Sequence, residues 1–307
     1  MIKFVNKHLL GHFYALLVTI LVSLSFISSA SLAKVVNPIS LTLLRFLIAS
    51  IVLLPVVFLQ KNYWQQLKLV AWRGSIIGLL YALYFISFFE SLKTTTTLHT
   101  GTLYTLVPLL TAVLSTFIFQ QKLSFKNFII YIIGAFGTIW VIFDGNLIEI
   151  EFFSLDVGDY IFMIAVITTC AYSLLLKALY KSEFNVVVLI FTVLLSGTIW
   201  MFVTLLLLGK PLDWSRIHGI NIFHISYLAV GATVLSFLYF QKSIILLDPN
   251  KATAYIYLTP AFVVIFAFLF RLEYFPGFKV QVGIVISVIA TLLLEFSASD
   301  LRNSKKS

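Results

Sequence analysis

The chain has 307 residues, of which 61% are hydrophobic and 11% are charged, with a formal net charge of +9. Soluble domains carry about 25% charged residues, so this composition, with a mean hydropathy of +1.05, excludes a soluble globular protein and predicts an all-α integral membrane protein. The basic residues lie between apolar runs, where they set membrane orientation rather than bind nucleic acid. A single cysteine, Cys170, excludes a disulfide framework.

Ten apolar segments follow one another along the chain, and each is long enough to cross the hydrocarbon layer as a helix. Short connectors with turn-forming residues separate them, such as Asn37-Pro38 and Asp248-Pro249-Asn250. We therefore expect ten transmembrane helices, at residues 12–33, 39–59, 73–91, 97–119, 127–143, 158–179, 186–208, 223–245, 252–270 and 279–297.

The first segment has a second interpretation as a secretory signal. Lys3 and Lys7 precede it, and Ser31-Leu32-Ala33 could serve as a weak cleavage site. The apolar run is long for a signal, and its serines continue into a helix that the internal repeat requires. We expect a retained first helix.

The second segment contains one charged residue, Arg45, which lies roughly 9 Å from the helix end at 1.5 Å per residue. A guanidinium stays protonated at cellular pH and is costly inside a bilayer. Arg45 either supports packing or gating, snorkelling outward or pairing with an acid such as Glu90, or faces a cavity and attracts an anionic group. The structural or gating role is the stronger expectation.

A shift of 152 residues places Pro108 on Pro260 and overlays segments three to five on segments eight to ten. We expect two repeats of five helices, at residues 1–150 and 151–307. Because five is odd, the second repeat enters the membrane with inverted topology, which is typical of secondary transporters. The paired prolines, each about halfway along its helix, are candidate kinks for gating.

Charge asymmetry predicts the orientation. With both termini in the cytoplasm, most lysines and arginines lie on the inner side, and the segment from Asp144 to Asp159 holds five acidic residues and no basic one. The positive-inside rule favours this arrangement. We expect a multi-pass protein of the inner (cytoplasmic) membrane.

Several local patterns, in this order and spacing, resemble the drug/metabolite transporter superfamily, EamA type. They are Asn37-Pro38 with Arg45-Phe46, Gly158-Asp159-Tyr160 with Ala171-Tyr172, and Pro260 with Arg271-Leu272-Glu273 and Gly283. The resemblance covers nearly the whole chain and implies a ten-helix carrier of small metabolites, amino acids or drugs, often an exporter. The chain departs from the family at Val22 and Thr169, near positions where tryptophan is frequent, and at Gln121, where glutamate is usual.

Polar and aromatic residues inside the spans are candidates for lining a substrate cavity. Tyrosine combines an apolar ring with one hydrogen-bonding tip, which suits amphipathic compounds. Each of these residues could instead bond to its own backbone or mark the membrane interface. The cavity candidates are Ser25, Tyr81, Tyr84, Tyr104, Tyr172, Tyr239 and Tyr255.

His99 and Glu90 are candidates for proton coupling, and both could equally be packing residues. We expect a secondary transporter that is not an enzyme and has no catalytic residues, metal or cofactor, because catalytic motifs such as GxSxG are absent. A channel or a membrane-embedded enzyme is the alternative. The expected partners are a small-molecule substrate and the lipid bilayer, without nucleic acid; the sequence leaves monomer and homodimer open.

Overall fold

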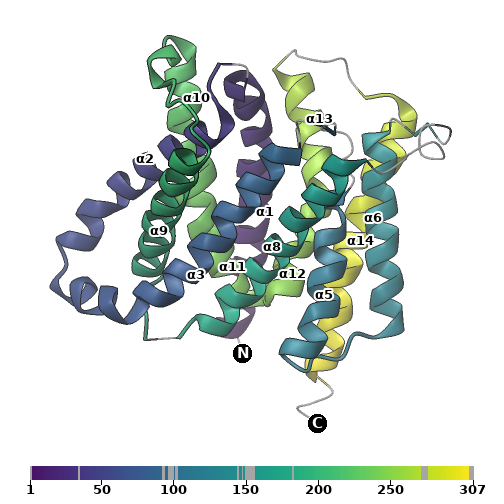
Figure 1. Cartoon of the computed structure of the whole chain (residues 1–307). Helices are drawn as coiled ribbons and strands as arrows, with labels where there is room; N and C mark the ends of the chain where they lie inside the picture. Colours follow the sequence, from purple (N-terminus) through teal and green to yellow (C-terminus); the bar gives the residue numbers. More distant parts are fainter. Residues whose placement is uncertain are drawn as a thin grey trace.

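The computed structural model describes residues 2–33, 35–91, 94–95, 100, 103–143, 145–146, 148, 156–181, 183–270 and 276–303, and these form a helical bundle (Figure 1). The helices of the first half are α1 (Ile2–Ala33), α2 (Pro38–Phe58), α3 (Lys61–Ser91), α5 (Leu106–Ile118) and α6 (Phe125–Ile142). Those of the second half are α8 (Val157–Leu179), α9 (Val186–Leu207), η1 (Trp214–Arg216), α10 (Ile220–Ala229), η2 (Val230–Leu235), α11 (Ser236–Leu247), α12 (Pro249–Ala254), η3 (Tyr255–Leu258), α13 (Thr259–Leu269) and α14 (Phe278–Asn303).

By length and composition, eight stretches of the described chain can cross a membrane as helices. Two shorter apolar helices, Leu106–Ile118 and Phe278–Leu294, correspond to the fourth and tenth segments expected from the sequence. Both chain termini lie at the same end of the bundle (Figure 1). The predicted all-α membrane architecture is confirmed.

Four predicted spans, the second, fifth, sixth and seventh, agree with α2, α6, α8 and α9 to within two residues. The others differ. The first and third helices begin earlier, at Ile2 and Lys61, because the helix continues into polar and basic residues before the apolar run. The tenth helix extends to Asn303, where it continues into polar residues. The regular helix of the fourth span, predicted at 97–119, begins at Leu106.

The two prolines do not sit in the middle of continuous helices, as the sequence suggested. Pro108 is the third residue of α5, and Pro260 lies in the first turn of α13, directly after the 3₁₀ turn η3. In the first turn of a helix the missing N–H of proline leaves no hydrogen bond unmade. Each proline therefore lies in the first turn of a regular helix.

Local capping residues explain two of the sequence patterns. The Asn37 side chain accepts a hydrogen bond from the Ile39 N–H at 3.0 Å, and Pro38 occupies the first helical position of α2. Asp156 and Asp159 form a reciprocal capping box at the start of α8. Asp159 is fully buried and also accepts a hydrogen bond from Thr95 at 2.6 Å, which ties α8 to the chain after α3.

The largest buried cluster lies between α2, α3, α8 and α9. Gly74 and Gly78 on α3 face α9 so closely that a Cβ at Gly78 would lie 2.6 Å from the Val193 carbonyl oxygen. Small residues allow membrane helices to approach at this distance and gain dispersion contacts. This packing fixes α3, which carries much of the site described below.

Candidate functional site

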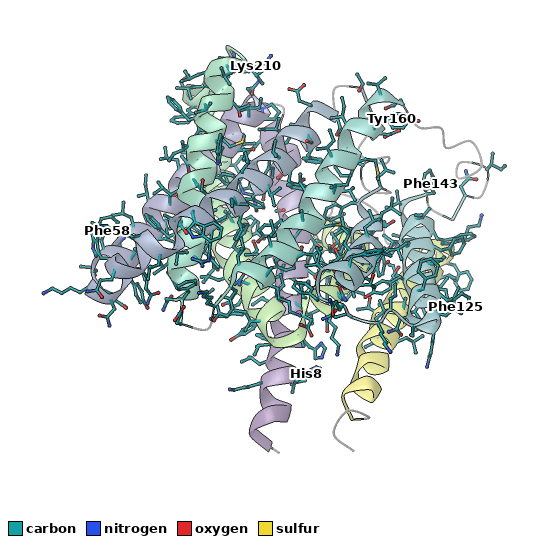
Figure 2. The ribbon with its side chains drawn as sticks, turned by 60° about the horizontal axis from the view of Figure 1, so that its bottom comes forward. His8, Phe58, Phe125, Phe143, Tyr160 and Lys210 are labelled. Carbon is teal, nitrogen blue, oxygen red and sulfur yellow. The ribbon has the colours of Figure 1, made fainter. Side chains whose placement is uncertain are left out.

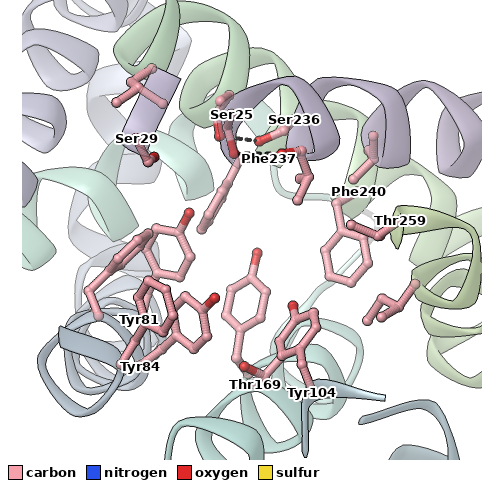
Figure 3. A pocket seen from close by; sticks show the side chains of 18 of the residues that line it. Ser25, Ser29, Tyr81, Tyr84, Tyr104, Thr169, Ser236, Phe237, Phe240 and Thr259 are labelled. Carbon is pink, nitrogen blue, oxygen red and sulfur yellow. Dashed lines mark hydrogen bonds between the residues drawn. The ribbon is translucent and has the colours of Figure 1, made fainter. Parts of the chain in front are cut away.

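A cavity of about 190 Å³ lies inside the bundle (Figure 3). This far exceeds the roughly 10–15 Å³ that one water molecule requires. Its walls come from both halves of the chain: α1, α2 and α3, Tyr104 just before α5, α8, and the stretch from α10 to α13. Five of the seven predicted cavity residues line it, namely Ser25, Tyr81, Tyr84, Tyr104 and Tyr172.

Aromatic rings in mutual contact form one wall. Tyr81 stacks on Tyr172 with ring centroids 5.6 Å apart and meets Phe237 edge to face at 4.4 Å. Tyr84 stacks on Phe88 at 6.1 Å and lies 6.3 Å from Tyr104. Contacts of this kind add to the energy of area burial, so the rings form a rigid apolar surface with hydroxyl tips.

The Tyr172 hydroxyl is buried and makes no hydrogen bond within the described structure. Leaving such a group unpaired costs about 1–3 kcal/mol. The neighbouring serines differ, because Ser25 donates to the Val22 carbonyl at 2.6 Å and Ser236 to the Ala232 carbonyl at 2.7 Å. Tyr172 is thus a hydrogen-bonding group that a bound molecule can satisfy.

Among the described lining residues, Arg45 is the one that carries a charge. Its side chain is 8% exposed. Nη2 donates to the Ala232 carbonyl at 2.8 Å, Nε donates to the Thr233 hydroxyl, and the guanidinium lies 5.3 Å from the Phe85 ring centre. The described contacts of Arg45 thus involve neutral groups rather than the carboxylate of Glu90.

The two hydrogen-bond acceptors of Arg45, Ala232 and Thr233, lie on η2. This π-helical turn interrupts the eighth predicted span between α10 and α11. Thr233 also donates to the Leu228 carbonyl, five residues earlier, at 2.7 Å. Short π-helical turns inside α-helices occur often at functional sites. Arg45 of α2 therefore braces an irregular turn in the second half of the chain beside the cavity.

The remaining predicted site residues lie elsewhere. Neither Tyr239 nor Tyr255 is among the described lining residues. The Tyr239 ring stacks on that of Tyr14 with centroids 5.3 Å apart, and the Tyr255 hydroxyl lies 3.1 Å from His12 Nδ1. Glu90 is half-buried near the end of α3, outside the cavity lining. Pro108 and Pro260 lie outside it too. His99 falls outside the described residues.

The sequence analysis missed the phenylalanines of the wall. Phe85 and Phe88 lie four residues after Tyr81 and Tyr84, so helical spacing placed them on the same face. Thr169 and Val22, noted as departures from the family pattern, both line the cavity. Small residues at these two places leave part of the space open.

The chain matches the EamA-like transporter family over residues 9–143 and again over 156–296. The "Uncharacterized transporter YyaM" of Bacillus subtilis (strain 168) is 25% identical over 266 residues, which cover 86% of this chain and 85% of the relative. A solved structure described as "Crystal structure of protein" has a TM-score of 0.76 at 18% identity, over 95% of this chain and 98% of its own, which shows a shared fold. Two matches in tandem cover most of the ten-helix, multi-pass membrane chain, so the predicted resemblance is confirmed and the chain belongs to the EamA-like transporter family.

Proposed function

We propose that this chain is a secondary carrier that works by alternating access, binds its substrate in the aromatic cavity and exports it from the cell. The observation that carries the proposal is the cavity itself, because α1–α3 of the first half, with α8 and α10–α13 of the second half, line the same space. A site between two repeats is what alternating access requires.

The chemistry of the wall supports a class of substrate. Stacked rings favour an apolar or aromatic portion, and tyrosine hydroxyls, above all that of Tyr172, favour hydrogen-bonding groups. The positive charge of Arg45 favours neutral or anionic molecules over cations. Small amphipathic metabolites, amino acids and drug-like compounds fit this description.

The position of the cavity supports a carrier closed on one side. On α1 the described lining begins at Ala15 and continues to Ser29, away from the N-terminus. On α3 it covers the last part of the helix, from Leu80 to Phe89. On these two helices the lining lies toward the end of the bundle away from the termini, and we propose that the end that carries the termini is the closed one. We propose, from the charge asymmetry, that this end faces the cytoplasm of a bacterial inner membrane.

Uptake by proteoliposomes tests the proposal. The purified chain is reconstituted, and the uptake of labelled amino acids, nucleosides, amphipathic acids and amphipathic amines is measured with and without a pH gradient. Thr169→Trp should fill the cavity and abolish saturable uptake. Ile167→Trp is the matched control, since Ile167 lies two residues earlier on α8 with 54% exposure on the outer surface. Uptake that survives Thr169→Trp would contradict this site, and linear, unsaturable uptake would indicate a channel.

A further inference from the structure

The short corner between α11 and α12 is tied to helices of the first half of the chain. Asn250 Nδ2 donates to Ser115 Oγ at 2.6 Å, near the end of α5, and to Gln121 Oε1 at 2.9 Å, just after α5. The Tyr131 hydroxyl of α6 donates to the Asn250 carbonyl at 3.4 Å. In Figure 1, α12 lies in the lower part of the bundle, toward the two termini. These contacts therefore join the two halves on the side of the proposed closed end.

The backbone of the same corner is strained. Asp248 has φ 87° and ψ 152°, a region that only glycine adopts without cost. Its carboxylate pairs with Lys177 Nζ in the last turn of α8, and the same Nζ lies 4.6 Å from the Phe119 ring centre. Strain of this kind persists only where surrounding contacts hold it. The corner is therefore kept in place by its partners rather than by its own backbone preference.

Buried amide groups near the corner add a second cost of closure. Gln241 is completely buried on α11, about two turns before Asp248, and neither Nε2 nor Oε1 has a hydrogen-bond partner within the described structure. The Oδ1 atom of Asn250 is also buried without one. Phe237, one turn before Gln241, lines the cavity, so Gln241 lies along α11 between the cavity and the corner. Unpaired buried groups favour a state in which water reaches them.

We propose that the segment Asp248–Asn250 is the latch of the closed end, and that its release lets α11 and α12 move away from α5 and α6. The hydrogen bonds of Asn250 and the ion pair of Asp248 stabilise the closed state. Release relaxes the backbone of Asp248 and lets water hydrate Gln241. These gains and costs are of the same order, so the latch has two states that a small difference in interaction energy can exchange.

The latch is connected to the cavity through α12. Ala252, two residues after Asn250, and Ile256 of η3 are lining residues, so a molecule in the cavity contacts the segment that carries the latch. Figure 2 shows His8 at the end of the bundle where α1 begins, with Tyr160 at the opposite end. Release of substrate at the first of these ends rests on the proposed carrier function, whereas the two states of the latch do not.

Double electron–electron resonance on the full chain in lipid nanodiscs, without substrate, tests the latch directly. Cys170→Ala removes the single native cysteine, and spin labels on Lys126→Cys and Ile245→Cys, at two exposed positions, report the distance between α6 and α11. We expect a shorter distance from the closed state and a longer one from the open state. Asn250→Ala should raise the ratio of longer to shorter distances about tenfold, because the hydrogen bonds of the side chain are lost. An unchanged ratio would overturn the proposal.

Ser115→Ala removes one of the two acceptors of Asn250, so it should raise the same ratio about threefold to fivefold. This variant decides the question if Asn250→Ala does not fold. Thr116→Val is the matched control and should leave the ratio unchanged, because the Thr116 hydroxyl donates to the Val113 carbonyl of its own helix at 2.7 Å. Equal ratios for Ser115→Ala and Thr116→Val would contradict the latch.

A substitution with the opposite effect separates the latch from a general loosening of the bundle. Gln241→Met has a similar length and removes the unpaired amide, so in the Asn250→Ala chain it should lower the ratio about tenfold. Gln281→Met should have no effect, since the Gln281 amide donates to the Pro276 carbonyl at 3.0 Å. A ratio that Gln241→Met leaves unchanged or raises would refute the balance proposed here. Since no substrate is present, these results are read independently of whether uptake is observed.

Discussion

Arg45 lies against neutral groups of α3 and η2. The Ala232 carbonyl, the Thr233 hydroxyl and the Phe85 ring surround its guanidinium. Hydrogen bonds to a charged donor contribute about 1.5–3 kcal/mol each, which offsets part of the cost of burial. Because Arg45 also lines the cavity, its charge can act on a substrate. Its hydrogen bonds to Ala232 and Thr233 hold the π-helical turn in place.

Arg45→Ala should lower the thermal unfolding midpoint and reduce transport of every substrate alike, because the brace between α2 and η2 is lost. We expect a destabilisation of about 2–3 kcal/mol. Arg73→Ala is the control, since Arg73 donates to the Leu69 carbonyl of its own helix. A loss confined to anionic substrates, with unchanged stability, would instead assign Arg45 to direct substrate contact.

Tyr172→Phe should leave the free protein as stable as before, or more stable by about 1–3 kcal/mol, because it removes a buried hydroxyl that has no hydrogen-bond partner among the described residues. Substrate affinity should fall about tenfold if the hydroxyl bonds the substrate. Thermal unfolding with and without substrate measures both effects.

Tyr257→Phe provides the contrast to Tyr172→Phe. The buried Tyr257 hydroxyl donates to the Tyr131 carbonyl at 2.8 Å, outside the cavity, so its loss should destabilise the chain by about 1 kcal/mol without changing affinity. Unchanged affinity in both variants would argue against a substrate contact at Tyr172.

The broken helices are the elements best placed to move. Between α11 and α13 the chain passes through α12 and the 3₁₀ turn η3 before Pro260 starts a new helix. A residue with positive φ, Asp248 at 87°, precedes this segment and marks a sharp change of direction. Such short segments contain few continuous helical hydrogen bonds, so they can shift without unwinding a long helix.

Pro260→Ala and Pro108→Ala should therefore slow turnover about threefold or more while substrate affinity stays within a few-fold, because alanine lets the two helical parts join and stiffen. Steady-state uptake at several substrate concentrations separates the two quantities. Unchanged turnover in both variants would contradict the prediction that these prolines act as hinges.

The contact between α3 and α9 is tightly packed, so we expect these two helices to move less than the short segments between α11 and α13. Gly78→Ala should destabilise the chain by about 2 kcal/mol, since its Cβ would lie 2.6 Å from a backbone oxygen and the two helices would have to separate. Gly277→Ala is the matched control, because nothing lies within 4 Å of a Cβ built there. Equal thermal midpoints for the two variants would contradict this packing.

Over the whole molecule, hydropathy located the membrane helices well, because the bilayer demands a long apolar run for each crossing. It misplaced the starts of α1 and α3, where helices continue into polar residues that no hydropathy rule marks. No sequence pattern indicated the π-helical turn at Val230–Leu235, which is in contact with Arg45 of another helix.

Part of the cavity lining could be predicted from the sequence, where residues share one face of a single helix. Tyr81 and Tyr84 share a helical face, so their joint position in the cavity followed from spacing. Tyr239 and Tyr255 have the same chemistry, and only the tertiary structure places them outside the cavity lining.

The central claim is that one cavity binds the substrate and opens to the two sides in turn. Exchange across proteoliposome membranes tests it most directly. A carrier predicts that unlabelled substrate on the far side accelerates entry of labelled substrate, and that Thr169→Trp abolishes this acceleration while Ile167→Trp preserves it. Entry that is unaffected by substrate on the far side, at every concentration, would contradict alternating access and indicate a pore.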